Sequence, residues 1–125
     1  MKYAMLVYSD QRAWAAMTED EAAAARAESM PRWIALFEEF GKADPSVHGR
    51  ELASAAEAKV VRVVDGKTVV TDGPYAEVKE SLGGYYLFSC DTIEDAIEWA
   101  ANIPAAWTGG AIEVRPVHVE EEAAA

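Results

Sequence analysis

Residues 71–88 read TDGPYAEVKESLGGYYLF, and this stretch decides how the strands on either side of it are interpreted. After Thr71 come Asp72-Gly73-Pro74, a charged segment and Gly83-Gly84, and the stretch ends in an aromatic strand. Two residues would be enough to join neighbouring strands in a hairpin. The longer connection is therefore predicted to form a polar wall over a sheet face that the helices leave open.

The composition predicts one globular domain. A chain of 125 residues is typical of a single domain with its own core. We assign residues 1–119 to that domain and residues 120–125 to an acidic, alanine-rich tail. The net charge of −11 makes nonspecific binding to nucleic-acid phosphates unfavourable.

The sequence predicts a cytoplasmic protein that does not enter the membrane. It contains no apolar run of about 18 residues, the length that a transmembrane helix requires. Asp10 and Arg12 end the N-terminal apolar run too early for a signal peptide. The single cysteine, Cys90, excludes an internal disulfide and is typical of a reducing compartment.

The first half of the chain predicts a strand and a long helix. Residues 2–9 are apolar on both alternating faces, which indicates a central strand, and residues 9–17 are expected to form a loop carrying Trp14. Thr18 and Glu21 have the spacing of a capping box. We expect the helix that follows to reach about Phe40, with Pro31 kinking or splitting it and Gly41 capping it.

The second half predicts five further strands and a second helix. Strands are expected at residues 47–52, 59–64, 67–71, 84–90 and 111–119, with residues 53–58 as a loop. Asp65-Gly66 has the composition of a type I′ hairpin turn. Asp91 is the predicted cap of the second helix, with Glu94 at the reciprocal position; its buried stripe is expected to comprise Ile93, Ala96, Ile97, Ala100 and Ile103.

This order of elements predicts an α+β fold: a ferredoxin-like split βαβ plan with an inserted β-hairpin. Both helices would cover one face of an antiparallel sheet. Along the last strand Ile112 and Val114 point one way, while Glu113, Arg115 and Val117 point the other. A mixed apolar and charged face suits a homodimer that encloses a polar cleft.

The motif quoted first, together with MKYAMLVYSD, IEDAIEWAANIPAA and AIEVRPV, resembles the DGPF branch of the YCII-related family, with Tyr75 where phenylalanine is usual. The resemblance covers about residues 2–118. It implies small bacterial proteins of the dimeric α/β-barrel type whose activity is not established. Some members are encoded beside extracytoplasmic-function sigma factors, which implies a link to transcription.

Two departures from the family pattern concern catalysis. Related proteins carry a His-Asp pair with the histidine in the first helix, but here that helix reads AAAARAESMPRW. The following glycine-rich segment is HGREL, which keeps Gly49 and Leu52 and adds His48 and Arg50. The resemblance therefore does not carry the His-Asp catalysis over to this chain.

The candidate site combines two catalytic candidates with five ligand-binding ones. His48 titrates near neutral pH and could act as a general base; Asp72 could orient it or simply form the turn. The ligand-binding candidates are Tyr8, Glu77, Lys79, Tyr85 and Arg115. An arginine facing away from the helices needs either a carboxylate of the 72–80 segment or an anionic ligand.

Two functional hypotheses follow from these residues. In the first, the protein binds a small ligand in the cleft and carries out cofactor-free acid–base chemistry, since no cofactor motif is present and two histidines without ligand spacing predict no metal site. In the second, it is a noncatalytic regulatory or protein-interaction module connected with sigma-factor-associated transcription.

Overall fold

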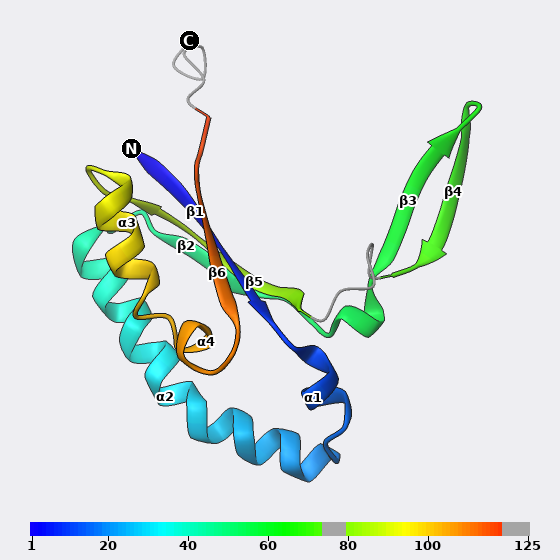
Figure 1. The fold of residues 1–125 in the computed structure, drawn as a ribbon, viewed down its shortest axis with the longest axis horizontal. Helices are drawn as coiled ribbons and strands as arrows, with labels where there is room; N and C mark the ends of the chain where they lie inside the picture. Colours follow the sequence, from blue (N-terminus) through cyan, green and yellow to red (C-terminus); the bar gives the residue numbers. More distant parts are fainter. Residues whose placement is uncertain (74–79, 119–125) are drawn as a thin grey trace.

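The computed structural model describes residues 1–73 and 80–118, which contain a four-stranded antiparallel sheet. Its strands are β1 (Lys2–Ser9), β2 (His48–Glu51), β5 (Ser81–Ser89) and β6 (Ala111–Pro116), in the order β2-β5-β1-β6 (Figure 1). Strand β1 pairs with both β5 and β6. The prediction that the apolar N-terminal strand is central is confirmed.

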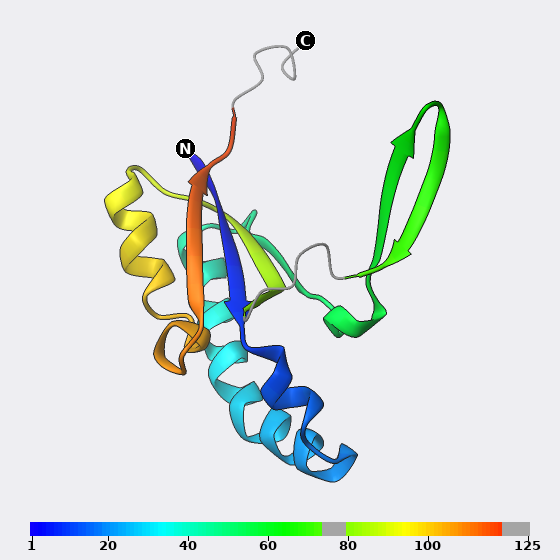
Figure 2. The same cartoon turned by 45° about the vertical axis from the view of Figure 1, so that its right-hand side comes forward.

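The main helices lie on one side of this sheet (Figures 1 and 2). They are α2 (Glu19–Ala43) and α3 (Ile93–Ala100), followed by the short α4 (Pro104–Trp107). Between them and the sheet lies the core, whose fully buried large side chains are Met5, Phe40, Phe88 and Ile103. This α+β arrangement is consistent with the ferredoxin-like plan predicted from the order of elements.

Helix α2 begins as predicted but ends later. The Thr18 hydroxyl accepts from the Glu21 N–H at 3.1 Å, and the Glu21 carboxylate accepts from the Thr18 N–H at 2.9 Å. The helix contains Pro31 and is not split there. The predicted end at Gly41 is wrong, because Gly41 lacks the positive φ of a glycine cap and the Asp44 N–H still bonds to the Phe40 carbonyl.

Three local predictions need correction. The expected loop at residues 9–17 contains α1 (Gln11–Ala15), which starts where the Asp10 carboxylate accepts from the Arg12 N–H at 3.0 Å. Residues 53–58 contain the 3₁₀ helix η1 (Ala55–Glu57). The cap of α3 is Thr92 rather than Asp91, since the Thr92 hydroxyl accepts from the Asp95 N–H.

Asp44 fastens the end of α2 to the sheet. The residue is buried, and its carboxylate accepts from the Ser46 N–H and hydroxyl and from the Ser89 N–H at 2.7 to 3.0 Å. Burial raises the pKa of Asp44, but the bonds from Ser46 and Ser89 and the attraction to Lys2 outweigh it and leave the pKa below its ordinary value.

The inserted hairpin is confirmed, and it forms a sheet of its own. Strands β3 (Lys59–Val64) and β4 (Lys67–Asp72) pair only with each other among the described strands. Asp65 and Gly66 have φ values of 51° and 75°, as a type I′ turn requires. Figures 1 and 2 show the hairpin standing apart from the four-stranded sheet, on the side opposite α2 and α3.

Among the described residues, no helix combines the length and the apolar character needed to cross a membrane.

Candidate functional site

The described helices leave one face of the four-stranded sheet uncovered, and we call this the open sheet face. The alternation of β1 and β5 separates the two faces: Tyr3, Met5 and Val7 are buried under the helices, whereas their neighbours are only half-buried. Strand pairing then places the following side chains on the open sheet face: Ala4, Leu6, Tyr8, His48, Arg50, Tyr85, Leu87, Glu113 and Arg115.

These side chains form two rows that cross all four strands. In the first row, His48 pairs with Leu87, Leu87 with Ala4, and Ala4 with Arg115. Ala4 and Leu87 are half-buried, while His48 and Arg115 are exposed at the two sheet edges. The aliphatic side chains of Ala4 and Leu87 thus lie between the imidazole of His48 and the positively charged guanidinium group of Arg115.

The second row has the same plan. Arg50 pairs with Tyr85, Tyr85 with Leu6, and Leu6 with Glu113. The exposed Arg50 and Glu113 again lie on the two edge strands. Together the rows place two guanidinium groups and one carboxylate around a central apolar strip.

A hydrogen bond links the two rows at the β2 edge. Nε2 of His48 lies 3.0 Å from the Tyr85 hydroxyl oxygen, and the two ring centroids are 5.7 Å apart. One imidazole nitrogen is therefore oriented by a group that can both donate and accept a proton. The pair could move a proton to or from a ligand resting on Leu87 and Leu6.

A second hydrogen bond lies toward the β6 edge. The Tyr8 hydroxyl donates to Oε1 of Glu113 at 3.2 Å. Desolvation raises the pKa of Tyr8, the bond to Glu113 raises it further, and Arg115 opposes this effect. Tyr8 therefore stays a neutral hydrogen-bond donor at physiological pH.

Two glycines in neighbouring strands permit this arrangement. A Cβ on Gly49 would lie 2.5 Å from the Tyr86 ring and 2.9 Å from the Tyr85 carbonyl oxygen. Only glycine therefore fits between His48 and Arg50 while Tyr86 fills the core beneath them. In β5 the register skips Gly83 opposite Val7 and Tyr8, which is the irregularity of a β-bulge.

Three of the predicted ligand-binding residues are brought together with one catalytic candidate. Tyr8, Tyr85, Arg115 and His48 all lie on the open sheet face. Asp72 does not belong to this group: it is the last residue of β4, and its carboxylate bonds to Nζ of Lys59. Glu77 and Lys79 lie outside the described residues.

The predicted ion pair of Arg115 is not formed with the described part of the 72–80 segment. Asp72 pairs with Lys59, and within residues 1–73 and 80–118 Arg115 makes no salt bridge. Arg115 is exposed, so water can solvate its guanidinium group. Because no carboxylate of the described residues forms a salt bridge with Arg115, its guanidinium group is available to an anionic ligand.

Sequence reasoning left Arg50 and Glu113 out of the site. Both could have been found from period-two alternation, because Arg50 lies two residues after His48 and Glu113 lies two residues before Arg115. Arg50 donates to the Gly49 carbonyl at 2.7 Å, which holds its guanidinium group close to β2.

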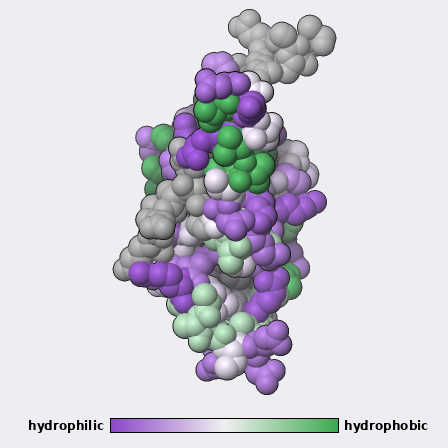
Figure 3. Space-filling model, turned by 90° about the vertical axis from the view of Figure 1, so that its right-hand side faces the viewer, coloured by the Kyte–Doolittle hydropathy of each residue, from purple (hydrophilic) through white to green (hydrophobic). Residues whose placement is uncertain are grey.

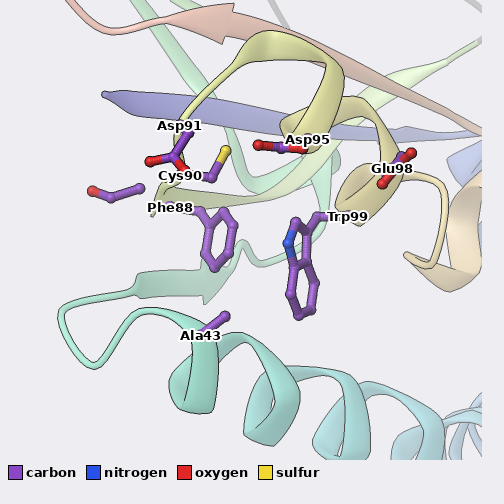
Figure 4. A pocket seen from close by; sticks show the side chains of 8 residues that line it. Ala43, Phe88, Cys90, Asp91, Asp95, Glu98 and Trp99 are labelled. Carbon is purple, nitrogen blue, oxygen red and sulfur yellow. The ribbon is translucent and has the colours of Figure 1, made fainter.

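A separate hollow of about 320 Å³ lies on the helix side of the sheet (Figure 4). Carboxylates dominate its polar lining, and Cys90 lies among them; the lining residues are Ala43, Phe88, Ser89, Cys90, Asp91, Asp95, Glu98 and Trp99. Burial and then the charge of Asp95 raise the pKa of the Cys90 thiol. A thiol with a raised pKa is a poor nucleophile.

No group of three His, Cys, Asp or Glu side chains in the described part of the chain has the arrangement of a metal site.

Comparisons with known proteins agree with the motifs quoted at the outset. The model of the YCII-related domain matches residues 1–121. A protein of Rhizobium meliloti (strain 1021), itself named as uncharacterized, is 34% identical over 120 residues, which cover 94% of this chain and 92% of the relative. The chain belongs to the YCII-related family.

Proposed function

We propose that the open sheet face binds a small anionic ligand. The observation that carries this proposal is the placement of Arg50 and Arg115 at opposite edges of an aliphatic strip in a protein whose net charge is −11. Planar guanidinium groups bind carboxylate or phosphate oxygens through paired hydrogen bonds. Leu6 and Leu87 would receive the apolar part of the same ligand.

A second copy of the chain would enclose this ligand. The open sheet face carries half-buried Leu6, Leu87 and Tyr85 with no described helix over them. Two such faces packed together would form a homodimer of the dimeric α/β-barrel type and exclude water from the polar groups between them. In that environment the interactions of the two arginines with an anion become stronger.

The same site supports cofactor-free acid–base catalysis. His48 and Tyr85 share a hydrogen bond, and a ligand above Leu87 would contact both. His48 would take a proton from the bound molecule, and the Tyr85 hydroxyl would supply or accept one at a neighbouring atom. Asp72, bonded to Lys59, has no part in this proposal.

The alternative function is that of a noncatalytic regulatory module. One observation favours it: α2 contains no histidine, so the His-Asp pair of related proteins is absent from this chain. The module would bind the same class of ligand without converting it.

The first experiment is a thermal-shift screen of the wild-type protein with inorganic phosphate, short carboxylates and carbonyl-containing acids. A ligand that binds the folded state raises its melting temperature by mass action. We expect stabilisation by at least one anion, with dissociation constants about tenfold higher in Arg50→Ala and in Arg115→Ala. Lys42→Ala, which removes an exposed cation at the end of α2, is the matched control and should bind like the wild type.

Equal binding by the wild type and the Arg50→Ala/Arg115→Ala double variant would contradict the proposed site, as would the absence of any stabilising anion. Incubating each binding compound with the wild type and with His48→Gln separates the two functions. Conversion that His48→Gln abolishes indicates catalysis, whereas tight binding without conversion indicates the regulatory module.

A further inference from the structure

The β3–β4 hairpin carries an exposed apolar face. Cross-strand pairing puts Val61 opposite Val70 and Val63 opposite Thr68, so the three valines share one side of the hairpin. Their exposed fractions are 61% for Val61, 69% for Val63 and 57% for Val70. We call these three residues the valine face. In Figure 3, where the hairpin is nearest the viewer, hydrophobic groups gather in the upper part of the surface.

This face has no partner within the described residues of its own chain. The hairpin forms a separate two-stranded sheet, and both cartoon views show it standing clear of the four-stranded sheet. An isolated two-stranded hairpin is only marginally stable in water, and contiguous exposed apolar side chains are typical of interaction sites.

The charge of the hairpin differs from that of the rest of the chain. Residues 59–72 carry three cationic side chains, Lys59, Arg62 and Lys67, against Asp65 and Asp72, for a net charge of +1. Because the whole chain has a charge of −11, the other residues together carry −12. Outside its hairpin, a second copy of this chain is therefore opposite in net charge to the hairpin.

The base of the hairpin is fastened to the body of its own chain. Oε1 of Gln11 accepts from the Ala55 N–H in η1 at 2.8 Å, and Nε2 of Gln11 donates to the Leu82 carbonyl in β5 at 3.5 Å. The Gly73 N–H bonds to the Ala58 carbonyl at 2.8 Å and closes the hairpin at its base. These bonds connect the base of the hairpin to α1 and β5, and the hairpin extends from there in the direction that Figures 1 and 2 show.

That direction leads away from the helices. Figures 1 and 2 show the hairpin on the side of the four-stranded sheet opposite α2 and α3, which is the side of the open sheet face. A second copy seated on the open sheet face would therefore also lie within reach of the hairpin.

From these observations we infer that the hairpin is an assembly arm: its valine face packs against a second copy of this chain. The inference rests on the homodimer of the proposed function and adds the element that holds it together. By two-fold symmetry each chain would give one arm and receive one.

The test is sedimentation equilibrium of two matched double variants. Val61→Thr/Val63→Thr makes the valine face polar, while Val64→Thr/Val69→Thr makes the same change on the other side of the hairpin. Threonine keeps the shape and strand preference of valine. We expect the wild type to have twice the monomer mass of 13.6 kDa, with a dimer dissociation constant at least about tenfold higher in the first variant and within about threefold of wild type in the second.

A monomeric wild type, or equal dissociation constants in the two variants, would overturn the inference. A second measurement requires no substitution. Carbodiimide cross-linking of a mixture of ¹⁵N-labelled and unlabelled wild-type chains should join Lys67 of one isotope to carboxylates of the other, and cross-links confined to one isotope would also overturn it.

These outcomes are distinguishable from those of the ligand test. If the arm is wrong but the ligand site is correct, both hairpin variants remain dimeric and bind the anion normally. If the ligand site is wrong but the arm is correct, Val61→Thr/Val63→Thr dissociates while no anion binds to the wild type.

Discussion

His48 in β2 and Tyr85 in β5 are joined by a hydrogen bond of 3.0 Å although 37 positions of sequence separate them. The bond is diagonal, because the direct cross-strand partner of His48 is Leu87 and that of Tyr85 is Arg50. It therefore connects the two rows of the open sheet face through the histidine of the first row and the tyrosine of the second.

Replacing Tyr85 by phenylalanine should change the environment of His48 without unfolding the protein. The bond is accessible to solvent, so the free energy of unfolding should fall by no more than about 1 kcal/mol. We expect the imidazole ¹⁵N shifts of His48 to change, since its Nε2 loses a partner, while those of His118 stay the same. Unchanged His48 shifts would show that the bond is not made in solution.

Arg115→Ala should leave the protein as stable as the wild type. The side chain is exposed and makes no salt bridge with the described residues. Such surface substitutions usually alter the free energy of unfolding by less than about 0.5 kcal/mol. Urea titration can measure this; a loss near 3 kcal/mol would instead indicate a buried ion pair.

Asp44→Ala should destabilise the fold strongly, by about 2–3 kcal/mol, because the Ser46 and Ser89 donors lose their shared acceptor in a buried position. Glu39→Ala, which removes only the exposed partner of Lys42, is the control and should cost less than about 1 kcal/mol. Urea unfolding at pH 7 compares the two variants.

The contribution of Asp44 to the free energy of unfolding should also depend on pH. The pKa of Asp44 is lowered in the folded state, so the folded protein binds the proton more weakly than the unfolded chain. The stabilisation is present above the unfolded pKa of about 3.9 and is lost as the pH falls through the lower folded value. The difference in unfolding free energy between wild type and Asp44→Ala should shrink over that range; a constant difference would contradict the assignment.

Two glycine-to-alanine substitutions should act in opposite directions. At Gly49 the new methyl group would collide with Tyr86 and the Tyr85 carbonyl, at an expected cost of about 1–3 kcal/mol. At Gly41, inside α2, nothing lies within 4 Å of the added carbon, and alanine should stabilise the helix by roughly 0.5–1 kcal/mol. Equal thermal shifts for both would exclude the close approach at Gly49.

Most of the fold could be predicted because its signals are local. Alternation identified the central strand, Thr18 and Glu21 identified the start of α2, and Asp65-Gly66 identified the hairpin turn. Errors occurred where neighbouring residues compete for one role. Asp91 and Thr92 can each cap α3, and Gly41 has the right composition for a helix end although the chain remains helical to Ala43.

The site could be predicted only in part because its geometry depends on strand register. Alternation placed Arg115 opposite the helix-packed face, but it could not show that Arg115 shares a row with His48 across four strands. It also could not reveal that Lys59 binds the Asp72 carboxylate, since that pair follows from the hairpin register. Alternation along one strand therefore does not show that Asp72 is bonded within the hairpin.

The position of β1 has a consequence for synthesis on the ribosome. Residues 2–9 are synthesised before both of their neighbours in the sheet, which come from the distant segments 81–89 and 111–116. The nascent chain must therefore carry this largely apolar strand without its β5 partner until residues 81–89 are made, and without its β6 partner until residues 111–116 are made. If translation stalls before codon 111, one edge of β1 has no paired strand. That edge can then pair with β1 of another chain that is being synthesised on the same polysome.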